Sequence, residues 1–126
     1  MVMPYDKNNV FAKIIRNEIP SKKVYEDDYV LAFHDIAQAA PVHIIVIPKG
    51  EYISFDDFTH DAGVDEIANF WKKVRAIAHE QGADKGGYRI ITNHGKHASQ
   101  SVPHFHVHII GGRALGALLP GDIVDR

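Results

Sequence analysis

The chain has 126 residues, which suits a single domain that buries roughly two-thirds of its unfolded surface. Its net charge is −2 with both signs mixed along the chain, so it lacks the basic balance of a nucleic-acid binder or a protein of anionic membranes. The absence of cysteine excludes disulfides, thiolate metal sites and cysteine nucleophiles. The N-terminal residues contain no long apolar run, so we expect no signal peptide, no membrane span and a cytoplasmic location.

The first half of the chain predicts one short helix and three strands. The helix covers residues 9–16, where an asparagine can cap the N-terminus and apolar side chains recur at helical spacing. The strands, at residues 24–26, 29–33 and 42–47, are rich in β-branched and aromatic residues. The third strand lies between two prolines and is almost entirely apolar, which is typical of a buried strand.

The second half predicts a long helix, two more strands and a tail. The helix runs from about residue 61 to 81, with apolar residues at helical spacing and a glycine placed to end it. Strands follow at 88–92 and 104–110, separated by a polar loop. The tail, residues 114–126, contains leucines and Ile123 without periodicity, and suits its own domain or a second subunit equally. Together these elements predict one α+β domain over residues 1–126, built on a mostly meandering antiparallel sheet of about five strands.

Three histidines alternate with apolar residues in the last predicted strand. His104, His106 and His108 would share one face of the sheet, because successive strand residues point to opposite faces. Burying three imidazoles would require a partner for every ring nitrogen, so the pattern favours chemistry over a purely structural role. A three-histidine metal site and nucleophilic attack on phosphorus by one imidazole both remain open. The preceding loop favours phosphorus chemistry, because it supplies neutral amides and hydroxyls and no acid to support a metal.

The pattern at residues 104–110 resembles the signature of the histidine triad (HIT) superfamily. Residues 19–27, 31–36, 40–49, 100–102 and 111–113 are similar to its Hint branch, the histidine triad nucleotide-binding proteins, so the resemblance covers essentially residues 8–113. It implies a HIT-like fold and an enzyme that cleaves the P–N bond of purine nucleoside 5′-monophosphoramidates, such as AMP-lysine. The reaction would pass through a covalent nucleotidyl-histidine intermediate without a metal or cofactor. The implied partners are a purine nucleotide (AMP or GMP) and a second copy of the chain.

The resemblance also implies roles for individual residues. His106 would be the nucleophile, His108 would contact the phosphate oxygens, and His43 would complete the catalytic cluster from the neighbouring strand. His104 would support and orient the others, and Ser101 would lie near the leaving nitrogen. The nucleotide would be held by Asp35 at the ribose, by Asn93, Ser99 and Gln100 along the polar loop, and by Phe11, Phe33 and Ile36 around the base.

Two features of the chain depart from the Hint pattern, and two other functions remain as alternatives. Ser99 stands where Hint proteins often have glycine, so a positive φ there would strain the backbone. The tail lacks the aromatic residue that these proteins commonly place in the partner's active site. The first alternative is a dinucleoside polyphosphate hydrolase, against which the Gly111-Gly112-Arg113 ending argues. The second is a metal-binding three-histidine module.

Overall fold

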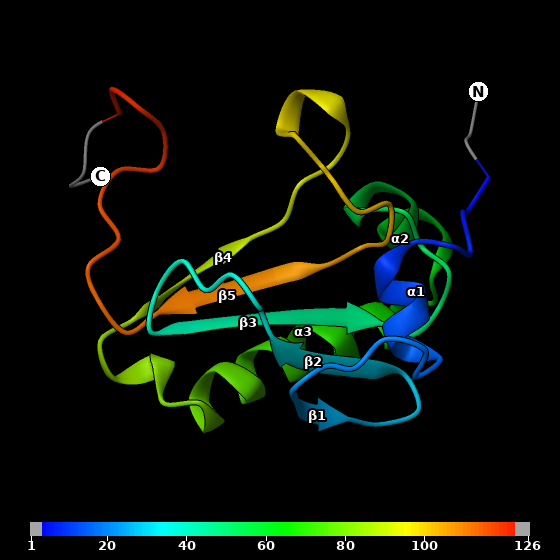
Figure 1. The fold of residues 1–126 in the computed structure, drawn as a ribbon, viewed down its shortest axis with the longest axis horizontal. Helices are drawn as coiled ribbons and strands as arrows, with labels where there is room; N and C mark the ends of the chain where they lie inside the picture. The colour runs from blue at the N-terminus through cyan, green and yellow to red at the C-terminus, as the bar shows by residue number, and fades with distance from the viewer. Residues whose placement is uncertain (1–3, 123–126) are drawn as a thin grey trace.

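The computed structural model describes residues 4–122, so residues 1–3 and the tail residues 123–126, Ile123 among them, lie outside the described part (Figure 1). Its elements, in chain order, are α1 (Val10–Ile15), β1 (Lys23–Glu26), β2 (Val30–His34), β3 (Val42–Pro48), α2 (Phe55–Asp61), α3 (Val64–Glu80), η1 (Ala83–Lys85), β4 (Tyr88–Ile91), η2 (Lys96–Ala98) and β5 (Val107–Gly111). Within residues 4–122, no helix is both long and apolar enough to cross a bilayer.

The five strands form one antiparallel sheet, which confirms the predicted α+β class. The strand order is β1-β2-β3-β5-β4, so the predicted meander holds for the first three strands. Only the step from β3 to β4 departs from it, because β5 lies between these two strands; β4 and β5 are again neighbours. Because β5 pairs with β3, His108 at the end of the segment 104–108 lies directly beside β3.

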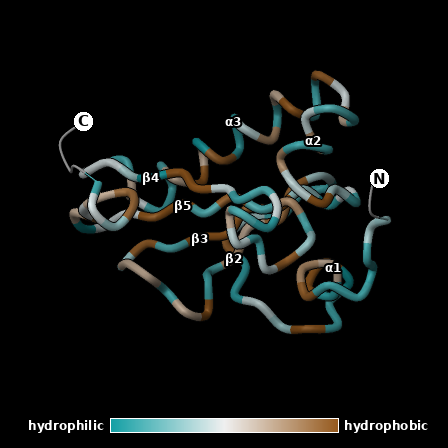
Figure 2. The backbone as a smooth tube through the Cα atoms, turned by 90° about the horizontal axis from the view of Figure 1, so that it is seen from above, coloured by the Kyte–Doolittle hydropathy of each residue, from teal (hydrophilic) through white to brown (hydrophobic). Residues whose placement is uncertain are grey.

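Different helices cover the two faces of the sheet. In Figure 2, α3 and α1 lie on opposite sides of the strands. The α2 and α3 side buries the larger core, in which Phe58 of α2 and Phe70 of α3 pack against Phe105. On the other side, Phe11 and Ile14 of α1 pack against alternate residues of β2 and β3, namely Leu31, Phe33, Ile45 and Ile47. His108 lies on this α1 side, because it pairs with Ile45.

Two predicted elements begin three residues later than expected, whereas the other predicted bounds differ from the observed ones by at most one residue. The helix expected at 61–81 is α3 at 64–80, and the separate helix α2 was not predicted. Ser54 caps α2, and Asp57 accepts hydrogen bonds from the backbone N–H groups of Ile53 and Ser54 at 2.7 Å each. The last strand begins at Val107 instead of residue 104, and the segment before it is anchored by Phe105, whose N–H donates to the Tyr52 carbonyl at 2.7 Å.

Candidate active site

Two adjacent strands bring the predicted histidines together. His43 lies in β3 and His108 in β5, on the same face of the sheet. The Nε2 atom of His43 lies 2.9 Å from Nδ1 of His108. His106 directly precedes β5, and its ring centroid lies 5.2 Å from that of His108. The site therefore has three neighbouring imidazoles, of which those of His43 and His106 are buried and that of His108 is partly exposed.

Asp35 joins this group from the end of β2. Its Oδ2 atom lies 3.3 Å from His43 Nε2. Its Oδ1 atom accepts a hydrogen bond from the Ala37 N–H at 2.7 Å, and its own N–H donates to the His43 carbonyl at 3.0 Å. The turn between β2 and β3 thus fixes the carboxylate beside the histidines.

Hydrogen-bond partners define which nitrogen of each histidine carries the proton. His106 Nδ1 lies 2.7 Å from the His104 carbonyl, which can only accept, so Nδ1 is protonated and Nε2 keeps its lone pair. His43 Nδ1 accepts from the Ala39 N–H at 3.0 Å, so His43 Nε2 carries the proton and can donate to His108 Nδ1. His108 then carries its proton on Nε2. The site thus offers a nucleophilic nitrogen on His106 and an N–H donor on His108.

His104 is bound by protein groups at both ring nitrogens. The ring is completely buried, and its Nε2–H donates to the Pro48 carbonyl at 2.8 Å. Its Nδ1 is therefore an acceptor, and the Tyr5 hydroxyl lies 2.5 Å from it. His104 thus contributes its backbone carbonyl to the site, whereas its ring nitrogens bind Tyr5 and Pro48. Nothing in the sequence pattern singled out Tyr5, because it is an isolated aromatic residue in a polar segment.

Burial keeps the imidazoles of the triad neutral near pH 7. It lowers the pKa of His104 to about 4 and the pKa of His106 below its usual 6.5. Burial, together with the neighbouring His106 and His43, also lowers the pKa of His108 to about 4. A neutral imidazole is the nucleophilic form, so these shifts favour attack by His106 at neutral pH.

Aromatic residues of α1 and β2 lie next to the nucleophilic ring. The Phe11 ring lies edge-on to His106 with centroids 4.9 Å apart, and it contacts Phe33 at 5.6 Å. Asn9 holds α1 in place, because its Oδ1 caps the helix by accepting from the Ala12 N–H at 2.9 Å. Ile36, expected to wall the base with these residues, is instead fully exposed. It lines an open cavity of about 820 Å³ together with Pro20, Ser21, Lys22, His34, Asp35 and Gln38.

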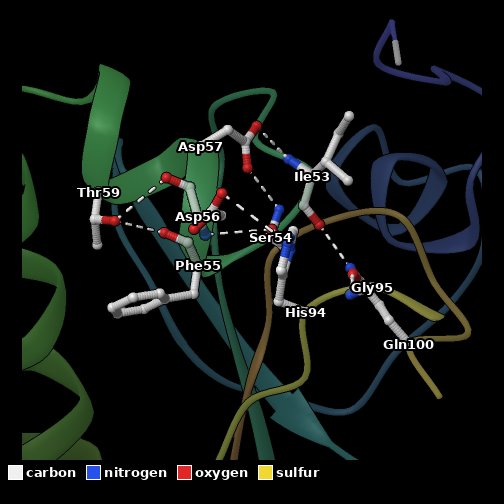
Figure 3. A network of polar contacts seen from close by, with 9 residues as sticks. All are labelled: Ile53, Ser54, Phe55, Asp56, Asp57, Thr59, His94, Gly95 and Gln100. Carbon is white, nitrogen blue, oxygen red and sulfur yellow. Dashed lines mark hydrogen bonds and ion pairs between the residues drawn. The ribbon is translucent and has the colours of Figure 1, made fainter. Parts of the chain in front are cut away.

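The polar loop before the triad is tied to the start of α2 (Figure 3). Gln100, expected to bind substrate, uses its amide internally: Nε2 donates to the Ile53 and Val102 carbonyls at 2.7 and 3.0 Å, and Oε1 accepts from the Gly95 N–H at 3.0 Å. His94 Nδ1 lies 2.6 Å from the Ser54 hydroxyl, a contact that the sequence did not indicate. These contacts hold the loop in place.

The other loop residues named by the sequence have different positions. Ser99 adopts the left-handed conformation, with φ 58° and ψ 39°, as expected for a position where glycine is common. Ser101 is exposed and Asn93 is partly buried, so both lie at the surface of the loop.

One set of groups in the site has the composition of a metal site. Single ligand atoms of Asp35, His43 and His108 all lie within 4.8 Å of one another. The metal alternative named a different set, the three histidines of the triad. Both ring nitrogens of His104 bind protein groups, and His106 is not among the residues whose ligand atoms converge. Two imidazoles and one carboxylate are ligands that Zn²⁺ accepts.

An activity that depends on attack by neutral His106 should persist well into the acid range. Since burial lowers the pKa of His106, its neutral form predominates at pH 6.5, where a solvated histidine would be half protonated. We expect the acid limb of kcat/KM to have its midpoint below pH 6.5, and activity to fall as the pH drops further and His106 gains a proton. A pH–rate profile of the free enzyme measures this midpoint. A midpoint of the acid limb above pH 6.5 would contradict the buried environment assigned to His106.

Comparison with known proteins shows the family of the chain. The HIT domain family matches residues 16–115. The chain is 56% identical to a HIT-like protein of Rickettsia prowazekii over 91% of this chain and 96% of that protein. It is 41% identical to the purine nucleoside phosphoramidase of Escherichia coli K12 over 90% of this chain and 94% of that enzyme. A histidine triad protein structure from Clostridium difficile superposes with a TM-score of 0.81 and 42% identity, covering 93% of this chain and all of that one. The chain therefore belongs to the HIT domain family.

Proposed function

We propose that the protein is a purine nucleoside phosphoramidase that hydrolyses the P–N bond of nucleoside 5′-monophosphoramidates. The observation that carries the proposal is the 2.7 Å hydrogen bond from His106 Nδ1–H to the His104 carbonyl, because it leaves Nε2 with its lone pair. The E. coli relative that bears this activity in its name is similar over most of both chains. The likeness to a solved HIT family hydrolase of Clostridium thermocellum supports the hydrolase class.

The reaction would proceed in two displacements at phosphorus. In the first, His106 Nε2 forms a bond to phosphorus, the P–N bond breaks, and the departing nitrogen takes a proton from a nearby donor. In the second, water attacks phosphorus, the Nε2–P bond breaks, and the water proton replaces the one that was donated. The His104 carbonyl would stabilise the positive charge on the nucleotidylated ring through the Nδ1–H, since hydrogen bonds to charged groups are the stronger ones.

The surrounding residues would bind the rest of the nucleotide. His108 would donate its Nε2–H to a phosphoryl oxygen, and Asp35 would accept from the ribose hydroxyls. Ser101 and Asn93 would contact the leaving nitrogen and the phosphate from the loop. Phe11 and Phe33 would wall the base, with Ile36 at the open rim. The contacts of Gln100 and the backbone conformation of Ser99 support a role in shaping this loop.

The choice of substrate separates this function from its nearest alternative. We expect an adenosine phosphoramidate with a lysine-like amine to be hydrolysed at least about 100-fold more efficiently than a diadenosine polyphosphate, a difference near 3 kcal/mol in barrier. Parallel kcat/KM measurements on the two substrates test this. Preferred cleavage of the polyphosphate would replace the proposal with a dinucleoside polyphosphate hydrolase.

The convergence of Asp35, His43 and His108 favours a metal-binding module as a second candidate. Under the proposed mechanism, exhaustive chelation should leave turnover within about 2-fold of the untreated enzyme, because no step uses a metal. The control is a chelated sample to which the chelator–metal complex has been added. Loss of most activity on chelation, with recovery on adding Zn²⁺, would support the metal-dependent alternative instead.

The cellular setting and assembly belong to the same proposal. We propose a homodimer acting in the cytoplasm on AMP or GMP derivatives. The backbone around the tail is held by two arginines: Arg89 donates to the Gly116 carbonyl at 2.8 Å, and Arg113 donates to the Ala39 carbonyl at 2.9 Å. Leu118 and Leu119 are nevertheless exposed, which supports a role of the tail in contacts between subunits. Sedimentation of the full chain tests the assembly.

A further inference from the structure

The segment before α1 lies against the histidine triad. The Tyr5 ring packs edge-on against His104, with centroids 5.6 Å apart and an interplanar angle of 73°, and its hydroxyl lies 2.5 Å from His104 Nδ1. The family match covers residues 16–115, so Tyr5 lies outside the matched region and His104 lies inside it. The mechanism described above does not use Tyr5.

The direction of this hydrogen bond follows from the other side of the ring. His104 Nε2 must carry a proton, because it lies 2.8 Å from the Pro48 carbonyl. In the neutral ring Nδ1 can then only accept, so the Tyr5 hydroxyl donates. Burial raises the pKa of Tyr5, which keeps this donor protonated at neutral pH. Since His104 is completely buried, loss of the hydroxyl would leave an acceptor without its protein partner.

Tyr5 is held in a short structured segment that reaches both of the first two histidines. The carbonyl of Asp6 accepts from the N–H and the Nδ2 of Asn9, at 3.2 and 2.8 Å. Asn9 caps α1, and Phe11 in the first turn of α1 packs edge-on against His104 at 6.5 Å and against His106 at 4.9 Å. Tyr5 and Phe11, at the two ends of residues 5–11, therefore pack against His104 and His106.

We propose that Tyr5 is a positioning residue for the nucleophile, acting through His104. By fixing the His104 ring, the Tyr5 hydroxyl fixes the backbone carbonyl of the same residue, which selects the His106 tautomer with its lone pair on Nε2. The inference rests on the proposed function, because the kinetic consequence requires His106 to attack phosphorus. Its structural part, the coupling of Tyr5 to the protonation of His104, does not require any activity.

Loss of the Tyr5 hydroxyl would also change the charge near His106, through the protonation of His104. The titratable groups around His104 are Tyr5 from the N-terminal segment, His106 on the same segment as His104, and Asp57 from α2. Without the Tyr5 donor the neutral form of His104 loses a hydrogen bond, so a proton on Nδ1 becomes easier to accept. A charged His104 would oppose the positive charge that forms on His106 during attack, so turnover should fall earlier on the acid side.

The substitution Tyr5→Phe removes only the hydroxyl, and Tyr29→Phe is its matched control. Tyr29 is 62% exposed and lies in the turn between β1 and β2. We expect Tyr5→Phe to lower kcat about 10-fold with KM within about 2-fold, less than the roughly 100-fold that a 1 Å misplacement can cost. We also expect the His104 pKa, read by ring ¹⁵N NMR, to rise by about 1, the equivalent of one lost hydrogen bond. Tyr29→Phe should change neither.

Combination with His104→Gln separates positioning from general stability. If Tyr5 acts through the His104 ring, Tyr5→Phe should change kcat by less than about 2-fold in the His104→Gln background. An equal 10-fold loss in both backgrounds, measured where circular dichroism shows every variant folded, would overturn the proposal. So would an unchanged kcat and an unchanged His104 pKa in Tyr5→Phe. If the wild type hydrolyses no phosphoramidate, the proposed function fails, whereas the NMR titration still decides whether Tyr5 controls His104.

Discussion

Replacing His106 with alanine is expected to lower phosphoramidate turnover at least about 1,000-fold, since removal of a covalent nucleophile typically costs this much or more. Neither neighbouring imidazole can substitute for it. His108 Nδ1 accepts from His43 at 2.9 Å, and His43 Nδ1 accepts from the Ala39 N–H at 3.0 Å, so their lone pairs are already engaged. AMP affinity should stay within about 5-fold, because the proposed ribose contact and most of the proposed base and phosphate contacts do not involve His106. Steady-state kinetics and calorimetric titration with AMP measure the two quantities.

The matched control is His60→Ala. The His60 side chain is 86% exposed on α2 and pairs with the Asp61 carboxylate. This substitution should leave turnover unchanged. Because His106 is buried, His106→Asn provides a second variant that fills more of the space and can still donate to the His104 carbonyl. More than a few per cent of wild-type turnover in either His106 variant would exclude it as the nucleophile.

Phe105→Ala is expected to lower the free energy of unfolding by about 3–5 kcal/mol, the usual cost of removing a buried phenyl ring. The ring is completely buried and stacks on Phe58 with centroids 4.8 Å apart, and it also contacts Phe70 at 5.2 Å. Phe105 lies between His104 and His106 in the sequence, so the packing of its ring fixes the segment that carries these two histidines. Denaturant unfolding followed by circular dichroism measures the loss.

Phe55→Ala serves as the control for that change, because Phe55 is 43% exposed at the start of α2. It should cost less than about 1 kcal/mol, as most partly exposed substitutions do. If Phe105→Ala were equally mild, the aromatic cluster would not be the anchor of the histidine segment. Turnover of the folded fraction of Phe105→Ala should also fall, since residues 104–106 lie outside the strand ladder.

The sequence predicted the strands well because their patterns are local. The β-branched residues of β3 reflect burial on both faces of the sheet, and the apolar alternation at Phe105, Val107 and Ile109 reflects burial on the α2 and α3 side. The position of β5 between β3 and β4 could not be predicted in this way, because periodicity carries no information on strand order. Helix α2 was missed although the spacing of Ser54 and Asp57 is that of a capping box, because its seven residues contain few apolar positions.

The residue types of the site could be predicted, but their hydrogen bonds could not. The alternation of histidines predicted a shared strand face for His104, His106 and His108, but of these only His108 lies in β5, where it contacts His43. The His106 tautomer depends on a backbone carbonyl, and the His104 tautomer depends on Pro48, which is distant in sequence. Loop polarity suggested that Gln100 faces substrate, whereas its amide satisfies three backbone groups that only the folded chain brings together.

Trapping the nucleotidylated enzyme tests the central claim most directly. The wild type is mixed with a slowly hydrolysed adenosine phosphoramidate, denatured within the first turnover at alkaline pH, digested and analysed by tandem mass spectrometry. The predicted result is a single AMP adduct on His106, absent from the His106→Ala protein and present in the His60→Ala control. An adduct on His43 or His108, or a full burst of released amine with no adduct on any histidine, would contradict it.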